Sequence, residues 1–305
     1  MILDYVVIIL NYNSSEYIRK AINTIRECST GVFRICVVDN NSPREGEKEI
    51  LLELKNEHDI EVLLLNSNEG YGSGNNRAFQ YMKSKYSFKY TVIMNPDIEL
   101  IESGTIEKVI KGVEENGAVG GQPLVWNCYY GNDPKVQVNI GKAVNYWGLC
   151  VISSVVLRCV FRNYFNKLVF INEMPYKKHI EYDVPSGAFF IIRTDVFQEI
   201  SGFDDETFLY GEESILGYKL SVKGYHMVLC PEYVVKHLQG VSTGYDRYSW
   251  DKKRLEYIQQ SRKVYMKKYL KCGKIKINIM IFILWIDYVM RKIYVQLKRG
   301  LKCIK

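Results

Sequence analysis

Four short apolar segments in the first 100 residues constrain the fold of this chain more than any other feature. They lie at residues 5–10, 35–38, 61–65 and 90–94 and are rich in β-branched side chains. Apolar runs of this kind are typical of strands that are covered on both faces, as in parallel sheets. Helical patterns follow at about residues 16–27 and 44–56. This alternation predicts an α/β fold, with a mainly parallel and doubly wound sheet.

Each of these strands ends in a cluster of polar residues. The clusters begin at Asn11, Asp39, Asn68 and Asn95. In open parallel sheets, ligands bind beyond the carboxyl ends of the strands. The sequence therefore predicts a nucleotide-type site within the first 100 residues.

The cluster at residues 68–76 contains three glycines, Gly70, Gly72 and Gly74. Glycines at the start of a helix let the backbone approach a ligand closely. A dinucleotide-binding fingerprint would need another glycine where Asn75 stands, and would follow the first strand instead of the third. We therefore expect a turn that contacts a nucleotide, and no hydride-transfer cofactor.

Several acidic residues and one histidine are candidates for chemistry, and each has a simpler alternative. Asp39 could accept hydrogen bonds from a ribose or base, or could cap a turn. Asp97 could hold a divalent cation at a diphosphate, or could end a strand. Glu212 and Glu213 could share a raised pKa suited to a general base, or could form a solvated helix start. His237 could bind metal or phosphate.

The net charge of +7 is distributed unevenly. Residues 252–305 carry 16 Lys and Arg against only Glu256 and Asp287, whereas the rest of the chain is acidic overall. A basic segment suggests an anionic membrane or a nucleic acid as partner. No groove-reading motif accompanies the charge, so we expect no nucleic acid. The eight cysteines show no C-x-x-C spacing, which indicates buried thiols in a reducing cytoplasm and no zinc or redox centre.

Residues 277–290 form an apolar stretch that spans about 21 Å as a helix, which is short of the roughly 30 Å of a bilayer core. We therefore expect a helix that lies in the membrane surface, with Trp285 in it and basic residues flanking it. Packing on the chain's own domain or on a partner subunit is the alternative, and a homo-oligomer is left open. Residues at about 144–180 read as an insertion that covers the sheet or contributes to an acceptor or membrane surface.

Taken together, these residues resemble glycosyltransferase family 2, the inverting enzymes with the GT-A fold, and in particular its rhamnosyltransferase-like branch of bacterial surface-polysaccharide synthesis. The likeness covers about residues 1–270. The matching segments, in the order the family has them, are NYN at 11–13, VVDNNS at 37–42, NEGYGSGNN at 68–76, NPD at 95–97, SGAFF at 186–190, GFDD through FLYGEE at 202–213 and HLQGVS at 237–242.

The resemblance implies a role for each matching residue. Asp97 and His237 would bind Mg²⁺ or Mn²⁺ at the donor diphosphate, and Glu213 would be the catalytic base, with Glu212 as its rival. The implied substrate-binding residues are Asn11, Asn13, Asp39, Asn68, Gly70, Gly74, Asn75, Asn95, Ser186 and Gly187. The implied donor is dTDP-rhamnose or a UDP-hexose, and the implied acceptor is a lipid-linked saccharide at the inner face of the cell membrane.

Three positions depart from the family pattern. Asn95 replaces an acid, Glu213 stands for an aspartate, and Ile215 occupies a position where a second acid often follows. A catalytically silent nucleotide-sugar-binding or assembly subunit is therefore the alternative. A nucleotidyltransferase is disfavoured because it would need a glycine- and arginine-rich loop after the first strand.

We expect a catalytic domain at residues 1–244, with a nucleotide-binding half at 1–100 and an acceptor-binding and catalytic half at 101–244. A basic amphipathic helical tail is expected at 245–305.

Overall fold

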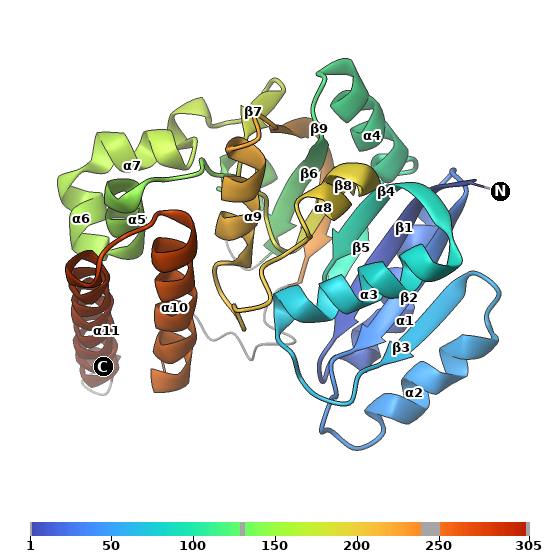
Figure 1. Ribbon diagram of the computed structural model, residues 1–305, viewed down its shortest axis with the longest axis horizontal. Helices are drawn as coiled ribbons and strands as arrows, with labels where there is room; N and C mark the ends of the chain where they lie inside the picture. Colours follow the sequence, from blue (N-terminus) through green and yellow to red (C-terminus); the bar gives the residue numbers. More distant parts are fainter. Residues whose placement is uncertain (1, 129–131, 239–250, 303–305) are drawn as a thin grey trace.

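The computed structural model describes residues 2–128, 132–238 and 251–302. In its first half, strands and helices alternate as the sequence predicts (Figure 1). The elements are β1 (Ile2–Asn11), α1 (Ser15–Cys28), β2 (Phe33–Asp39), α2 (Glu47–Glu53), β3 (Ile60–Leu64), α3 (Tyr71–Lys85) and β4 (Ser87–Met94). These strands pair in parallel in the order β3-β2-β1-β4.

The second half adds five strands, and six helices surround or follow them among the described residues. These elements are β5 (Ile98–Leu100), α4 (Thr105–Glu115), β6 (Gly120–Asn127), α5 (Tyr146–Ser153), α6 (Val155–Val160), α7 (Arg162–Leu168), β7 (Ile180–Tyr182), β8 (Phe189–Arg193), α8 (Thr194–Glu199), α9 (Glu212–Ser221) and β9 (Met227–His237). The sheet continues from β4 in the order β8-β6-β9-β5, and β7 pairs with β9.

The sheet is mainly parallel, as expected, because β1, β2, β3, β4, β6 and β9 run in one direction, and three strands run the other way. β8 runs antiparallel to β4 and β6, and both β5 and β7 run antiparallel to β9. The loop before β8 already lies at the carboxyl end of β4, where the Asn95 amide donates to the Ala188 carbonyl (2.8 Å), so β8 must run back along the sheet. Buried strands look the same in either direction, so sequence periodicity does not reveal this reversal.

Both faces of the sheet are covered, which explains the continuous apolar runs. Along β1, Val7 and Ile9 belong to a cluster with α1, α2 and α4. Val6 and Ile8 point the other way, into a cluster with α3, α8 and α9. The α/β class and its double covering are therefore confirmed.

A third apolar cluster joins the insertion to the C-terminal extension. The extension comprises α10 (Lys252–Val264), a π-helical turn (Tyr265–Tyr269) and α11 (Lys274–Lys302). Tyr265, Met280 and Leu284 of the extension pack with Leu149 and Leu168 of the insertion. Figure 1 shows α10 and α11 standing beside α5–α7, away from the first four strands. One side of the tail thus packs on its own chain, as the alternative interpretation held.

Among the described residues, none of the helices combines the length and the apolar character that crossing a bilayer would require.

Candidate active site

The first polar cluster forms where β1 and β2 end side by side. Asn11 and Asp39 are register partners, and the Asn11 side-chain amide donates to Asp39 Oδ1 (2.9 Å). Ser42 donates to both Asp39 oxygens, from its hydroxyl (2.6 Å) and its backbone N–H (3.1 Å). Asp39 is fully buried in this network. Asn13 joins it through its N–H, which donates to Ser42 Oγ (2.9 Å).

Glu47 belongs to the same network, although the sequence reading placed it on an ordinary charged helix. Its Oε2 accepts hydrogen bonds from the Asn11 side chain (3.0 Å) and the Ser15 N–H (3.0 Å), and Arg44 forms an ion pair with it. Burial acts to raise the pKa of Glu47, but these hydrogen bonds and the Arg44 charge outweigh it and lower the pKa. Residue type and spacing offered no signal for this contact across 36 positions.

The glycine-rich segment is tied to the end of β2 and to the segment before α9. The Asn40 side-chain amide donates to Asn68 Oδ1 (2.9 Å) and to the Gly70 carbonyl (3.0 Å). Gly70 has a φ of +87°, and a Cβ there would lie 2.4 Å from the Phe208 carbonyl oxygen. Only glycine therefore fits at position 70.

Gly74 and Asn75 lie inside α3 and face the protein interior. A Cβ on Gly74 would lie 2.6 Å from Leu10 Cδ1, so this glycine lets α3 pack closely on β1. Asn75 is fully buried and donates to the Tyr71 carbonyl (2.9 Å). The structure shows packing contacts for both, and their contact with a substrate stays a prediction.

Asp97 follows β4 and faces His237, the last residue of β9. Asp97 is 4% exposed, and its Oδ1 lies 3.3 Å from His237 Nε2. The strand β9 passes through an irregularity in its pairing with β6 and continues to His237, which the sequence reading placed beyond the strand. Residues 239–242 of the last matching segment lie outside the described residues.

Asn127, at the end of β6, fixes the orientation of this histidine. Its Oδ1 accepts a hydrogen bond from His237 Nδ1 (2.6 Å), because an amide oxygen cannot donate. In the neutral ring, Nε2 then keeps its lone pair on the side of Asp97. A buried carboxylate beside an imidazole oriented in this way is a donor set that fits a divalent cation. Sequence reasoning missed Asn127.

Glu212 and Glu213 begin α9, and Glu213 lies against the loop that precedes β8. A Cβ on Gly187 would lie 1.9 Å from Glu213 Oε1, so the carboxylate occupies the space that this glycine leaves free. The Tyr71 hydroxyl donates to the Gly187 carbonyl (2.5 Å), and the Ser186 N–H donates to Gln122 Oε1 (2.8 Å). The Ala188 carbonyl in the same loop accepts a hydrogen bond from the Asn95 N–H. The loop before β8 therefore contacts Glu213 and also the segment that carries Asp97.

The two carboxyl groups have different surroundings. Glu212 is 1% exposed and packs towards Gly72, and its Oε1 has no hydrogen-bond partner among the described residues. Burial and the charge of Glu213 raise the pKa of Glu212 to about 8. The Glu213 side chain is partly exposed to solvent. Desolvation raises the pKa of Glu213 as well.

Arg262 of α10 is the cation that faces this pair. Gly211 directly precedes the two glutamates, and Arg262 Nη1 would lie 3.6 Å from a Cβ at this glycine. The charge of Arg262 acts to lower the pKa of Glu212 and Glu213 against the effect of burial. Burial in turn lowers the pKa of Arg262. Sequence reasoning assigned this residue only to the basic tail, because nothing in the sequence indicates that α10 folds back over α9.

A largely apolar cavity of about 230 Å³ adjoins α9. Ser214, next to Glu213, lies on one side of it. Ile152 and Leu168 of the insertion and Tyr265 of the extension lie on the others. The insertion therefore contributes to the wall of a cavity beside the glutamate pair.

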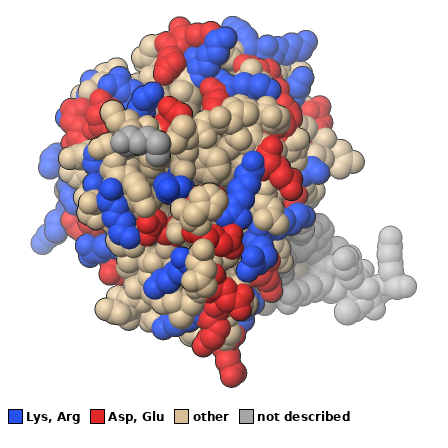
Figure 2. All heavy atoms as spheres, turned by 90° about the vertical axis from the view of Figure 1, so that its right-hand side faces the viewer, with Lys and Arg blue, Asp and Glu red and all other residues tan. Residues whose placement is uncertain are grey.

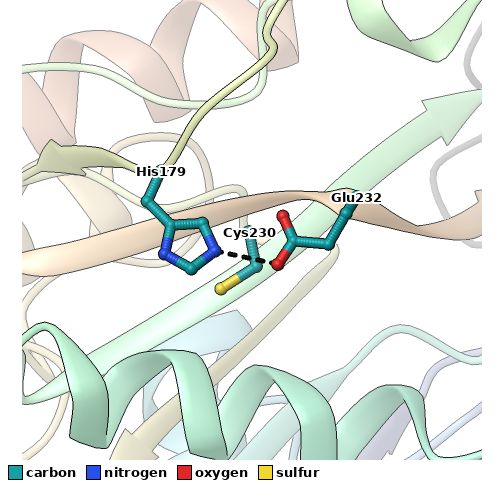
Figure 3. A group of neighbouring side chains, drawn as sticks. All are labelled: His179, Cys230 and Glu232. Carbon is teal, nitrogen blue, oxygen red and sulfur yellow. Dashed lines mark hydrogen bonds and ion pairs between the residues drawn. The ribbon is translucent and has the colours of Figure 1, made fainter.

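His179, Cys230 and Glu232 form a separate cluster of possible metal ligands (Figure 3). The Asn116 side-chain nitrogen donates to the Gly112 carbonyl (2.8 Å). The same nitrogen lies 2.9 Å from His179 Nδ1, and because an amide nitrogen can only donate, Nδ1 is the acceptor. Nε2 then carries the ring proton and donates to Glu232 Oε1 (2.8 Å). Burial raises the pKa of the Cys230 thiol to about 12. His179 and Glu232 therefore have hydrogen-bond partners without a cation.

The predicted site residues thus meet at one edge of the sheet. Asn11, Asp39 and His237 are the last residues of β1, β2 and β9, and Asp97 follows the end of β4. Ser186 and Gly187 precede β8, which starts at the same edge because it is antiparallel to β4. Glu213 reaches this edge through Gly187.

Comparisons with known proteins show similarity to glycosyltransferases. The model of the family described as "Glycosyl transferase family 2" matches residues 6–201. The low-salt glycan biosynthesis hexosyltransferase Agl10 of Haloferax volcanii is 24% identical over 243 residues, which are 79% of this chain and 69% of Agl10. The rhamnosyltransferase WbbL of Escherichia coli is 24% identical over 237 residues, 76% of this chain and 82% of WbbL.

Solved structures share the fold at low sequence identity. The mannosyltransferase PcManGT from Pyrobaculum calidifontis, in complex with GDP-Man and Mn²⁺, superposes with a TM-score of 0.57 and 14% identity, covering 100% of this chain and 76% of that one. GalNAc-T7 with UDP, GalNAc and Mn²⁺ superposes with a TM-score of 0.59 and 14% identity, covering 88% of this chain and 50% of that one.

Proposed function

We propose that this chain, which belongs to glycosyl transferase family 2, moves a sugar from a nucleotide-diphosphate donor to an acceptor hydroxyl with inversion at the anomeric carbon. One observation carries the proposal. Glu213 lies against Gly187 in the loop before β8. The next residue of that loop, Ala188, accepts a hydrogen bond from the backbone N–H of Asn95, two residues before Asp97. A candidate base and a candidate metal-binding carboxylate thus flank one edge of the sheet.

The donor side is formed by the ends of β1, β2 and β4. Asn11, Asn13, Asp39 and the loop at Asn68 and Gly70 would hold the nucleoside, and Asn95 would help to shape the site. Asp97 and His237 would hold Mg²⁺ or Mn²⁺, with Asn127 orienting the imidazole. The cation, when bound, neutralises charge on the diphosphate leaving group. The two structural neighbours that contain Mn²⁺ and a nucleotide or nucleotide sugar support this choice.

Glu213 is the group we assign as general base. Glu213 is partly accessible and its neighbour Ser214 lines a cavity, whereas Glu212 is buried and one of its oxygens has no hydrogen-bond partner among the described residues. Glu213 would accept the proton of the acceptor hydroxyl as that oxygen forms its bond to the anomeric carbon. The bond from the anomeric carbon to the diphosphate oxygen breaks on the opposite side, which inverts the configuration. Most of the rate would come from positioning and from charge stabilisation.

The proposed donors are dTDP-rhamnose or a UDP-hexose, because the relatives include a rhamnosyltransferase and a hexosyltransferase. The proposed acceptor is a lipid-linked saccharide in surface-polysaccharide synthesis. The apolar cavity beside Ser214 and the basic extension support an acceptor that is presented at a membrane. We place the protein at the inner face of the cell membrane, with α11 lying in the membrane surface.

The test measures sugar release and transfer from a panel of nucleotide sugars with Mn²⁺, Mg²⁺ or EDTA. Asp97→Ala and Glu213→Gln should each reduce turnover by about 10³-fold or more, since each removes a group at the reacting atoms. Glu232→Gln is the matched control, because Glu232 bonds only His179 outside the site. Full activity in both variants would contradict the assignment. Donor binding with no turnover by the unmodified protein would favour a silent nucleotide-sugar-binding subunit instead.

A further inference from the structure

The helix α6 is apolar but buries none of its residues. Five of its six side chains are Val, Leu or Cys, yet no residue of α6 falls in the buried class. Val160 is 66% exposed, and Val156 and Phe161 beside it are exposed too. A short helix of this composition normally packs against a core, so its exposed side requires an explanation.

The helix α11 has an apolar side that faces away from the protein. Met280 and Leu284 point into the cluster shared with the insertion, whereas Ile279, Phe282 and Ile286 are exposed. Their spacing of three and four residues places these three side chains on one face of the helix. Phe282 is 59% exposed. We call Val156, Val160, Phe161, Ile279, Phe282 and Ile286 the α6–α11 surface.

Asp287 of α11 joins α11 to α6, and its carboxylate is buried. Its Oδ1 accepts a hydrogen bond from the Val155 N–H at the start of α6 (2.7 Å), and its Oδ2 pairs with Arg291 (2.6 Å). Asp287 is 3% exposed. It is the only acidic residue of α11 and explains why a carboxylate interrupts an apolar stretch.

The two helices of the α6–α11 surface carry Lys and Arg, and their one acidic residue is the buried Asp287. Residues 134–172 contain no Asp or Glu, but they contain Lys and Arg, and so does α11. Lys274 and Lys292 are exposed on α11. The face of the molecule near the N-terminal half carries acidic and basic side chains interspersed (Figure 2). That mixed distribution differs from the charge carried by α6 and α11, which is basic apart from Asp287.

We propose that α6 of the insertion and α11 of the extension together form one docking surface for an anionic lipid bilayer. Exposed aliphatic and aromatic side chains with basic neighbours on the same helices match the acyl boundary and the anionic headgroups of such a bilayer. A second copy of this chain fits less well, because a symmetric dimer through this surface would bring two basic surfaces together. The inference rests on the proposed membrane association, but not on the proposed transfer chemistry.

The test is flotation of the full chain with phosphatidylcholine vesicles, with and without phosphatidylglycerol. Neither donor nor acceptor is present, so the result does not depend on whether the protein transfers sugar. We expect binding to the anionic vesicles and loss of binding in high salt. Val160→Glu and Phe282→Glu should each weaken binding by about tenfold or more, because each places a charge in the interface. Val32→Glu, an exposed valine before β2, is the control and should bind normally.

The outcomes separate the alternatives. Unchanged binding of Val160→Glu, together with loss in Phe282→Glu, would overturn the composite surface and leave a tail anchor alone. Equal binding to neutral vesicles would overturn the role of charge. A dimer in light scattering that Val160→Glu and Phe282→Glu both dissociate, without vesicle binding, would show that a second copy covers the surface. The unfolding temperature of each variant must match that of the unmodified protein, and Phe282→Ser replaces Phe282→Glu if it does not.

Discussion

Gly187 and Glu213 occupy adjoining space, such that a Cβ at position 187 would lie 1.9 Å from Glu213 Oε1. The clashing atom is the end of a flexible side chain, so the chain can fold with alanine at this position by moving the carboxylate. The absence of a side chain at Gly187 therefore determines where the proposed base sits.

The first prediction concerns this glycine. Gly187→Ala should lower kcat by about 10–100-fold, because the base moves away from the acceptor hydroxyl, while the unfolding temperature changes little. Gly273→Ala is the control, since a Cβ there would have no atom within 4 Å. Steady-state kinetics on both variants provide the measurement. A normal kcat in Gly187→Ala would argue against Glu213 as base.

The second prediction concerns stability and pH. Because burial and Glu213 raise the pKa of Glu212 to about 8, the folded state binds more protons than the unfolded state between about pH 4.5 and 8. Stability that is present below this window should therefore be lost as the pH rises through it. Glu212→Gln should reduce the loss, leaving the part that belongs to Glu213, and raise the free energy of unfolding at pH 8.5 by about 1–3 kcal/mol relative to the unmodified protein. Urea titrations at pH 5.5 and 8.5 test this, and an equal slope in both proteins would contradict it.

The third prediction concerns Arg262. Its charge lowers the pKa of both glutamates, so Arg262→Gln should raise these pKa values. The acidic limb of the kcat/KM profile should move to higher pH by about one unit, because the base ionises later. Lys263→Gln removes the same charge from the neighbouring exposed position and should leave the profile in place. A uniform loss of activity at every pH would indicate a structural effect of Arg262 instead.

The fourth prediction concerns the cation site. Asn127→Ala leaves Asp97 and His237 in the chain but frees the imidazole, so the Mn²⁺ concentration for half-maximal activity or for half-maximal thermal stabilisation should rise about 10–100-fold. Asn116→Ala releases His179 in the same manner and should not change either concentration. If both variants behave alike, the cation does not bind at His237.

The fifth prediction concerns the contact between α6 and α11. Asp287→Ala removes the acceptor of the Val155 N–H and leaves Arg291 without this carboxylate. We expect α11 to detach more readily and to be cut by protease at least about tenfold faster than in the unmodified protein. Limited proteolysis followed by mass spectrometry locates the cuts. Glu256→Ala on α10, where the carboxylate is exposed, is the control.

Local pattern was enough to predict the α/β class and the edge at which the site lies. The apolar runs that became β1, β2 and β4 are buried on both faces, and strand ends such as Asn11 and Asp39 must lie together when the strands are parallel. The same reasoning did not reveal which strands of the second half run the other way. Whether β8 runs with β4 or against it depends on which edge the preceding loop already occupies, and a buried strand carries no mark of its direction.

The sequence by itself determined which side chains could do chemistry, because a strand end or a helix start shows in the order of residue types. Only the tertiary structure decided which of them meet. Glu47 reaches Asn11, Asn127 orients His237, and α10 carries Arg262 to the glutamates. Each of these contacts joins segments that are far apart in the chain, and their formation depends on how the helices pack over the sheet. Packing depends on shape across the whole core, which no local window of sequence contains.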